Sequence, residues 1–88
     1  MEREERAVMS LESLARLDAG HELFQLGVSC MVGRSAPVDL ISAHKWFNVA
    51  AMLGYREAIR LRSEIAAEMS SAEITAAQRA ARAWITRH

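Results

Sequence analysis

Apolar residues recur at intervals of three and four along most of the chain, which is the spacing of helices with one buried face. The pattern predicts helices over residues 23–31, 39–54, 58–69 and 70–88. No segment shows the strict alternation of apolar and polar residues that is typical of a half-buried strand. We therefore expect an all-α fold of four or five antiparallel helices joined by short connections.

Residues that favour helix ends separate these segments. Gly33 suits a left-handed C-terminal cap, and Pro37 cannot continue a helix, so a short loop should follow residue 33. Asp39 is a natural N-cap for the next helix, which Gly54 should end. The stripe of that helix contains Leu40, Ala43, Phe47, Ala50 and Ala51, with Trp46 on its flank.

The last helix has the clearest apolar stripe in the chain. Ser70 and Glu73 before it have the spacing of a capping box, in which each side chain binds the backbone N–H of the other residue. The stripe then contains Ile74, Ala77, Ala81, Trp84 and Ile85. At the other end of the chain, residues 1–20 form an N-terminal helical segment with a modest stripe at Val8, Leu11, Leu14 and Ala15, and Asp18 could cap the helix that follows. The sequence leaves open whether residues 2–17 continue into that helix.

Composition agrees with one small helical domain covering residues 1–88. The chain has 51% apolar residues, sixteen alanines, one proline and four glycines, a composition that favours helices over a β-sandwich or barrel. Eleven basic residues balance eleven acidic ones, which argues against binding driven by bulk charge. The single cysteine, the mixed-charge start and the short apolar runs favour the cytoplasm and no membrane span. Ten of the eleven cations are arginine, which suggests a GC-rich, bacterial genome.

The middle of the chain resembles a known helical repeat. Twelve spaced positions over residues 26–58 carry the resemblance: Leu26, Gly27, Gly33, Pro37, Asp39, Ala43, Trp46, Phe47, Ala50, Ala51, Gly54 and Ala58. They resemble the Sel-one-like repeat, a relative of the tetratricopeptide repeat. The match departs from the pattern at Cys30, where a tyrosine is usual, and at Ser35, where a second loop glycine is usual.

The resemblance implies antiparallel hairpins in a tetratricopeptide-like, right-handed α–α superhelix. Residues 21–58 form one repeat unit, and residues 59–88 resemble C-terminal capping helices. Because repeat arrays usually need about three units for stability, one unit must cover its ends in another way. We expect the C-terminal helix to fold back as a cap and the chain to form a homodimer.

No group of residues has the spacing of a catalytic, cofactor or metal site. His44 has Asn48 four residues later but no further ligand nearby, so it is expected on the helix surface beside Trp46 and Phe47. Cys30 lies on an apolar stripe and has no CxxC partner, which favours a buried structural thiol. Trp84 continues an apolar stripe, which favours a core position over a base-stacking one. We therefore expect a protein that is not an enzyme and needs no cofactor.

Two functions remain open. The first is a protein-interaction module or adaptor with an unknown protein partner, since the repeats that the chain resembles present a groove lined by the first helix of each hairpin. His21, Gln25 and Ser29 form a polar line on that helix, away from the stripe of Leu23, Leu26 and Cys30, and are the candidate partner-binding surface.

The alternative is a DNA-binding or regulatory protein with a helix-turn-helix, formed by residues 50–55 and the helix after them. Arg56, Arg60 and Arg62 lie in that segment, and residues 23–88 carry a net charge of +3 (eight basic minus five acidic). Arg60 falls where a recognition helix usually needs an apolar anchor, so we expect nucleic acid to be the less favoured partner.

Overall fold

The computed structural model describes residues 19–87, which form four helices and contain no strand. They are α3 (Ala19–Val32), α4 (Leu40–Met52), α5 (Glu57–Ala66) and α6 (Ser71–Arg87). The predicted all-α fold is confirmed. Residues 1–18 of the expected N-terminal segment 1–20, which include its stripe and the Asp18 cap, and the terminal His88 lie outside the described residues, and residues 19 and 20 belong to α3.

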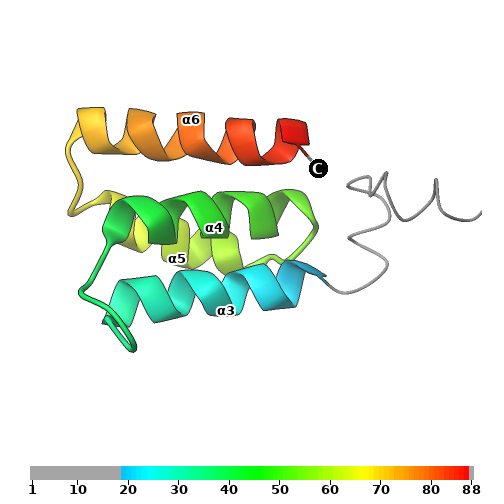
Figure 1. Cartoon of the computed structure of the whole chain (residues 1–88), viewed down its shortest axis with the longest axis horizontal. Coiled ribbons are helices and arrows are strands. Elements are labelled where there is room, and N and C mark those ends of the chain that lie inside the picture. Colours follow the sequence, from blue (N-terminus) through cyan, green and yellow to red (C-terminus); the bar gives the residue numbers. More distant parts are fainter. Residues whose placement is uncertain (1–18, 88) are drawn as a thin grey trace, which may run out of the picture.

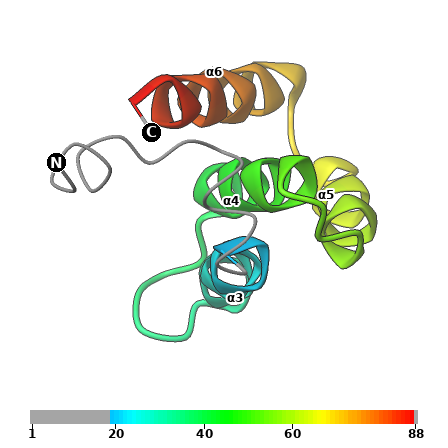
Figure 2. The same cartoon turned by 90° about the vertical axis from the view of Figure 1, so that its right-hand side faces the viewer.

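Helix α4 is the centre of the described part. Figure 1 shows α3 and α6 on opposite sides of α4, and Figure 2 shows α5 beside it. Helices α3 and α5 run antiparallel to α4, whereas α6 runs parallel to it. Each of the three packs closely on α4, and no other pair of described helices packs as extensively. One helix therefore organises the core.

The buried face of α3 differs from the predicted one. Leu23, Phe24 and Gly27 are buried against α4, but Leu26, which we expected on the same stripe, is 46% exposed. Successive residues of an α-helix are turned by 100° around its axis, so Leu26 points roughly 100° away from the mean direction of the three buried residues. The residue missing from the prediction is Phe24, whose ring contacts the rings of Phe47 and Tyr55 at centroid distances of 5.6 and 4.7 Å.

Helices α3 and α4 approach closely where Gly27 meets the Phe47 ring. A Cβ added to Gly27 would lie 2.5 Å from Phe47 Cε1 and 2.6 Å from its Cδ1. Phe47 is fully buried, so its ring has little room to move. Gly27 therefore permits the two helices to pack closely.

The predicted helix ends at Gly33, Asp39 and Gly54 are also confirmed, whereas the helix predicted over residues 58–69 ends earlier, at Ala66. Gly33 adopts the left-handed region with φ +72°, and its N–H donates to Ser29 O (3.0 Å). Asp39 caps α4: its Oδ1 accepts from the Ser42 backbone N–H (3.1 Å) and its Oδ2 from Ser42 Oγ (2.8 Å). Gly54, with φ +93°, lies in the turn that leads from α4 to α5.

Helix α6 begins at the predicted capping box and packs along the predicted stripe. The Ser70 N–H donates to Glu73 Oε1 (2.8 Å), and the Glu73 N–H donates to Ser70 Oγ (3.1 Å). Ala77 and Ala81 are buried, and Trp84 packs against the core with its ring edge-on to Trp46 at a centroid distance of 5.6 Å. Trp84 thus belongs to the α4–α6 contact, as its position on the stripe predicted.

The expectation that His44 lies on the helix surface is wrong. Its side chain is only 4% exposed, and its Nδ1 is buried with no hydrogen-bond partner. His44 follows Leu40 by four residues and precedes Phe47 by three, so it lies at the edge of the apolar stripe, and α4 has neighbours on three sides that cover this face. Burial lowers the pKa of His44, and the positive charge of Arg62 on α5 lowers it further.

Candidate interaction site

A pocket of about 470 Å³ lies where the C-terminal half of α3 meets the loop that leads to α4. Leu26, Ser29 and Cys30 line it from α3, and residues 35–39 line it from the loop. The loop follows the left-handed turn at Gly33 and is joined to α3 again where the Asp39 N–H donates to Cys30 O (2.9 Å). These two fixed ends make the loop arch beside the helix.

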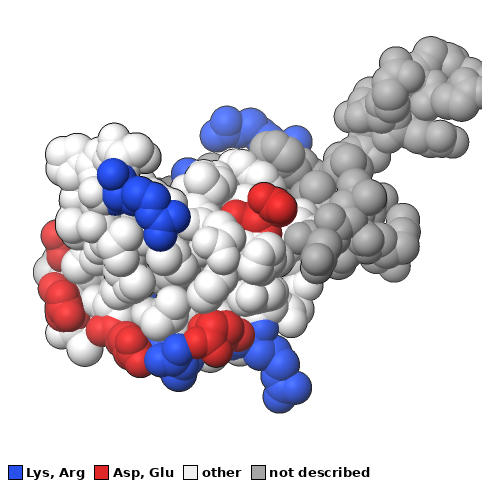
Figure 3. Space-filling view, turned by 90° about the horizontal axis from the view of Figure 1, so that it is seen from below, with Lys and Arg blue, Asp and Glu red and all other residues white. Residues whose placement is uncertain are grey.

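The pocket is mainly apolar and open to solvent. Leu26 is 46% and Val38 58% exposed, and both are among the large apolar side chains that the described residues leave exposed. On the face where α3 lies, many of the charged side chains follow one edge, while a basic and an acidic group lie within the face and the surface around them is largely uncharged (Figure 3). Exposed aliphatic side chains around a concave surface are characteristic of binding sites.

Asp39 is the one charged residue among those that line the pocket. Hydrogen bonds from the backbone and side chain of Ser42 lower the pKa of its carboxyl group, which is therefore ionised at neutral pH. The charge of Lys45 lowers this pKa slightly further, but the Lys45 ammonium lies 3.9 Å over the Trp46 ring. A carboxylate consequently stands at the edge of an apolar pocket.

Cys30 contributes an uncharged side chain to the pocket lining. Its side chain is half-buried and packs against the core. Burial raises the pKa of the Cys30 thiol, and the nearby Asp39 carboxylate raises it further, against a smaller opposite effect of Lys45. Because the thiolate is the nucleophile, this environment suits a structural thiol better than a reactive one.

The three residues of the candidate polar line lie along α3 but have different surroundings. Ser29 lines the pocket, Gln25 is exposed one turn earlier, and His21 is half-buried near the start of α3. His21 Nδ1 shares a hydrogen bond with the Tyr55 hydroxyl (3.1 Å), which links α3 to the turn between α4 and α5. His21 is therefore paired with another residue of the same chain. Ser29 lines the same pocket as Leu26, which the sequence pattern predicts on the buried stripe.

The sequence prediction missed the loop residues and Leu26 as site residues. A signal for them was present, because Val38 is a large aliphatic residue in a segment predicted as a loop. Such a residue has no helix face on which to be buried, so its exposure could have been anticipated. Assigning Phe24 instead of Leu26 to the buried stripe would have predicted that Leu26 is exposed, and so would have identified the α3 side of the pocket.

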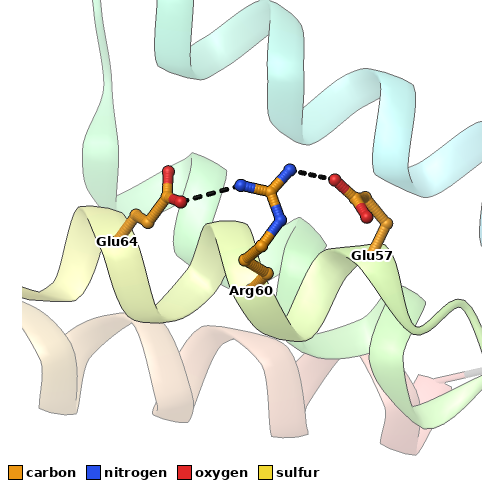
Figure 4. A network of polar contacts seen from close by, with 3 residues as sticks. All are labelled: Glu57, Arg60 and Glu64. Atoms are coloured by element: carbon orange, nitrogen blue, oxygen red, sulfur yellow. Dashed lines mark hydrogen bonds and ion pairs between the residues drawn. The ribbon is translucent and has the colours of Figure 1, made fainter.

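The arginines of α5 are engaged within the chain. Arg60 is paired with Glu57 and with Glu64 (2.8 Å to Glu64 Oε2), as Figure 4 shows. Arg62 donates to Asn48 Oδ1 on α4 (2.7 Å). A helix that reads DNA uses such side chains to reach bases and phosphates, and here Arg60 and Arg62 are each paired within the chain.

Within residues 19–87, no three His, Cys, Asp or Glu side chains are grouped so that they could hold a metal ion. None of the helices described here is long and apolar enough to cross a lipid bilayer. Comparison of the chain with protein-family models, with curated proteins and with solved structures found no match.

Proposed function

We propose that the chain is a non-enzymatic protein-interaction module of the Sel-one-like type, with about one repeat unit in a tetratricopeptide-like superhelix. The observation that carries the proposal is the pocket beside α3, where Leu26 of the helix and Val38 of the loop remain exposed although another face of α3 is buried. A folded domain of this size gains stability from each apolar side chain that it buries. Side chains left exposed around a pocket favour a role in binding.

The hairpin of α3 and α4 supports the repeat type. Gly27 stands where the two helices approach closely, Gly33 forms the left-handed cap and Asp39 caps the second helix. Ala43 and Ala50 are fully buried in the core. These are structural roles that explain why such a repeat would need these residue types. Helix α6, which packs on α4, would serve as the C-terminal cap.

Site-specific photocrosslinking tests the proposal. Leu26 is replaced by p-benzoylphenylalanine, and the chain is irradiated in cells that naturally produce it. The matched control carries the same amino acid at Met52, which is exposed to a similar degree (56% against 46%) but is absent from the pocket lining. We expect a defined crosslinked protein from position 26 and none from position 52. The purified partner should then bind the wild-type chain more tightly than the Val38→Ser variant.

Crosslinks of equal yield from both positions, or none from either, would count against an interaction module that uses this surface. A substrate-sized molecule bound in place of a protein would contradict the function more broadly.

A further inference from the structure

We propose that the pocket between α3 and the loop of residues 35–39 binds a short peptide segment in which an aliphatic side chain neighbours a lysine or arginine. This inference rests on the proposed function and specifies the partner of the same site. It follows from three properties of the pocket, namely its size, its apolar wall and its single charge.

The size of the pocket limits its occupant. A helix with its side chains is about 10–12 Å across, and a stable dimer buries about 800 Å² on each partner. A pocket of about 470 Å³ instead falls within the range that holds a small ligand or a few side chains. The occupant is therefore an extended segment that inserts one or two side chains, and the remainder of the partner lies outside.

The wall of the pocket selects an aliphatic side chain. Leu26, Pro37 and Val38 contribute hydrocarbon surface, and Cys30 contributes a neutral thiol. Inserting a leucine or isoleucine side chain here removes apolar surface of both partners from water. Ser29 and Ser35 add hydroxyl groups that can bind the peptide backbone of the segment.

The charge of the pocket selects the neighbouring residue. Asp39 is the one charged residue in the lining, and its two hydrogen bonds from Ser42 leave each carboxylate oxygen able to accept another. An ammonium or guanidinium group beside the inserted side chain would bind there, and a carboxylate would be repelled. Lys45 stands nearby and weakens the negative field, but its ammonium is held over Trp46.

Three blocked peptides test the proposal: acetyl-Gly-Leu-Leu-Lys-Gly-amide and the same peptide with glutamine or glutamate in place of lysine. Each is titrated into the full chain, and binding is followed by NMR amide shifts of the loop. A second readout is the rate at which iodoacetamide alkylates Cys30, the single cysteine of the chain, with and without peptide. We expect the lysine peptide to shift loop amides and to slow alkylation. The glutamine peptide should bind roughly two- to five-fold more weakly, as for a solvent-exposed ion pair, and the glutamate peptide more weakly again.

Matched variants identify the groups responsible. Asp39→Asn removes the charge but keeps a side chain that caps helices equally well, so it should abolish the preference for lysine without unfolding α4. Leu26→Gln and Val38→Ser alter exposed side chains and should weaken all three peptides. Met52→Gln, an equally conservative change of an exposed residue outside the pocket, should leave binding unchanged.

Equal affinity for the three peptides, or unchanged binding to Leu26→Gln, would overturn the proposal. So would sedimentation that shows self-association blocked by Val38→Ser, because the occupant would then be a second copy of the chain. If photocrosslinking at position 26 captures a partner while no peptide binds, the interaction function stands and the peptide class is wrong. If both experiments fail, both proposals fall.

Discussion

Gly27 lies so close to Phe47 that no side chain fits between them, and the Gly27→Ala variant tests how tightly α3 packs on α4. The added methyl carbon would lie 2.5 Å from the Phe47 ring. Carbon atoms pack best at about 3.5–4.0 Å, so the overlap is about 1 Å. Phe47 is fully buried and its ring contacts that of Phe24, which leaves the ring no free space to enter.

Two effects of Gly27→Ala oppose each other. Alanine is favoured over glycine in a helix interior by about 1 kcal/mol, whereas overpacking a filled core costs about 1–3 kcal/mol. The large overlap puts the cost near the upper end of that range, so we expect a net loss of about 2 kcal/mol in the free energy of unfolding. For a domain of this size, that loss lowers the Tm by about 8–16 °C.

Urea unfolding followed by tryptophan fluorescence measures this loss, since Trp46 and Trp84 meet at the α4–α6 contact. Gly20→Ala is the matched control, because a Cβ there would lie 3.3 Å from Tyr55 Cβ and needs only a small adjustment. We expect that control to be close to wild type in stability.

A double-mutant cycle with Phe47→Leu separates the clash from other effects. Phe47→Leu alone is destabilising because it leaves a cavity. In the double variant, the methyl group of the new alanine enters space that the ring has vacated. The loss of unfolding free energy in the double variant should therefore be smaller than the sum of the losses in the two single variants, by about 1–2 kcal/mol. Losses that add within about 0.5 kcal/mol, or a Gly27→Ala variant as stable as wild type, would refute the packing argument.

Three further predictions concern other parts of the fold. Ser70→Ala removes one of the two capping bonds of α6 and should cost about 1 kcal/mol in urea unfolding, whereas Ser70→Asp should retain the cap. The lowered pKa of His44 means that, below its ordinary value of about 6.5, the unfolded chain binds a proton that the folded chain does not. The free energy of unfolding should therefore fall as pH decreases from about 6.5, by at most about 1.4 kcal/mol per pH unit from this group, and should level off below the pKa of His44 in the folded chain. The His44→Leu variant should not show this loss. Equal pH profiles of the variant and the wild type would exclude His44 as its source. Because Arg60 and Arg62 are engaged within the chain, fluorescence anisotropy should detect no salt-dependent binding to duplex DNA, and strong binding at low salt would revive the helix-turn-helix alternative.

The helix ends could be predicted from sequence because they depend on local chemistry. A left-handed residue requires glycine at 33, a cap requires a side chain such as Asp39 and the reciprocal bonds at Ser70 require Glu73 three residues later. None of these depends on how the helices are arranged in space. The apolar stripes of α4 and α6 were predictable for a similar reason, since alanines and aromatic residues repeat there without a competing pattern.

The faces of the helices were harder to predict because they depend on which neighbours each helix has. His44 lies at the edge of the stripe of α4, and whether such a residue is covered depends on the helices packed around α4. For α3, Leu23 and Gly27 fit a stripe with Leu26 as well as one with Phe24, and the two choices differ by a rotation of the helix. The sequence alone does not show where the Phe47 ring lies, and the position of that ring determines which face of α3 is buried.

The same rotation explains why the site prediction was incomplete. Turning α3 so that Gly27 and Phe24 meet Phe47 necessarily turns Leu26 outward, toward the loop that carries Val38. The exposed aliphatic wall of the pocket is thus a geometric consequence of the close packing of Gly27 against Phe47. A variant that relieved that contact, such as Phe47→Leu with Gly27→Ala, would be expected to change the pocket as well, because the rotation of α3 would no longer be fixed by a single ring. Peptide titration of that double variant would show whether core packing and the binding surface are coupled through the orientation of this one helix.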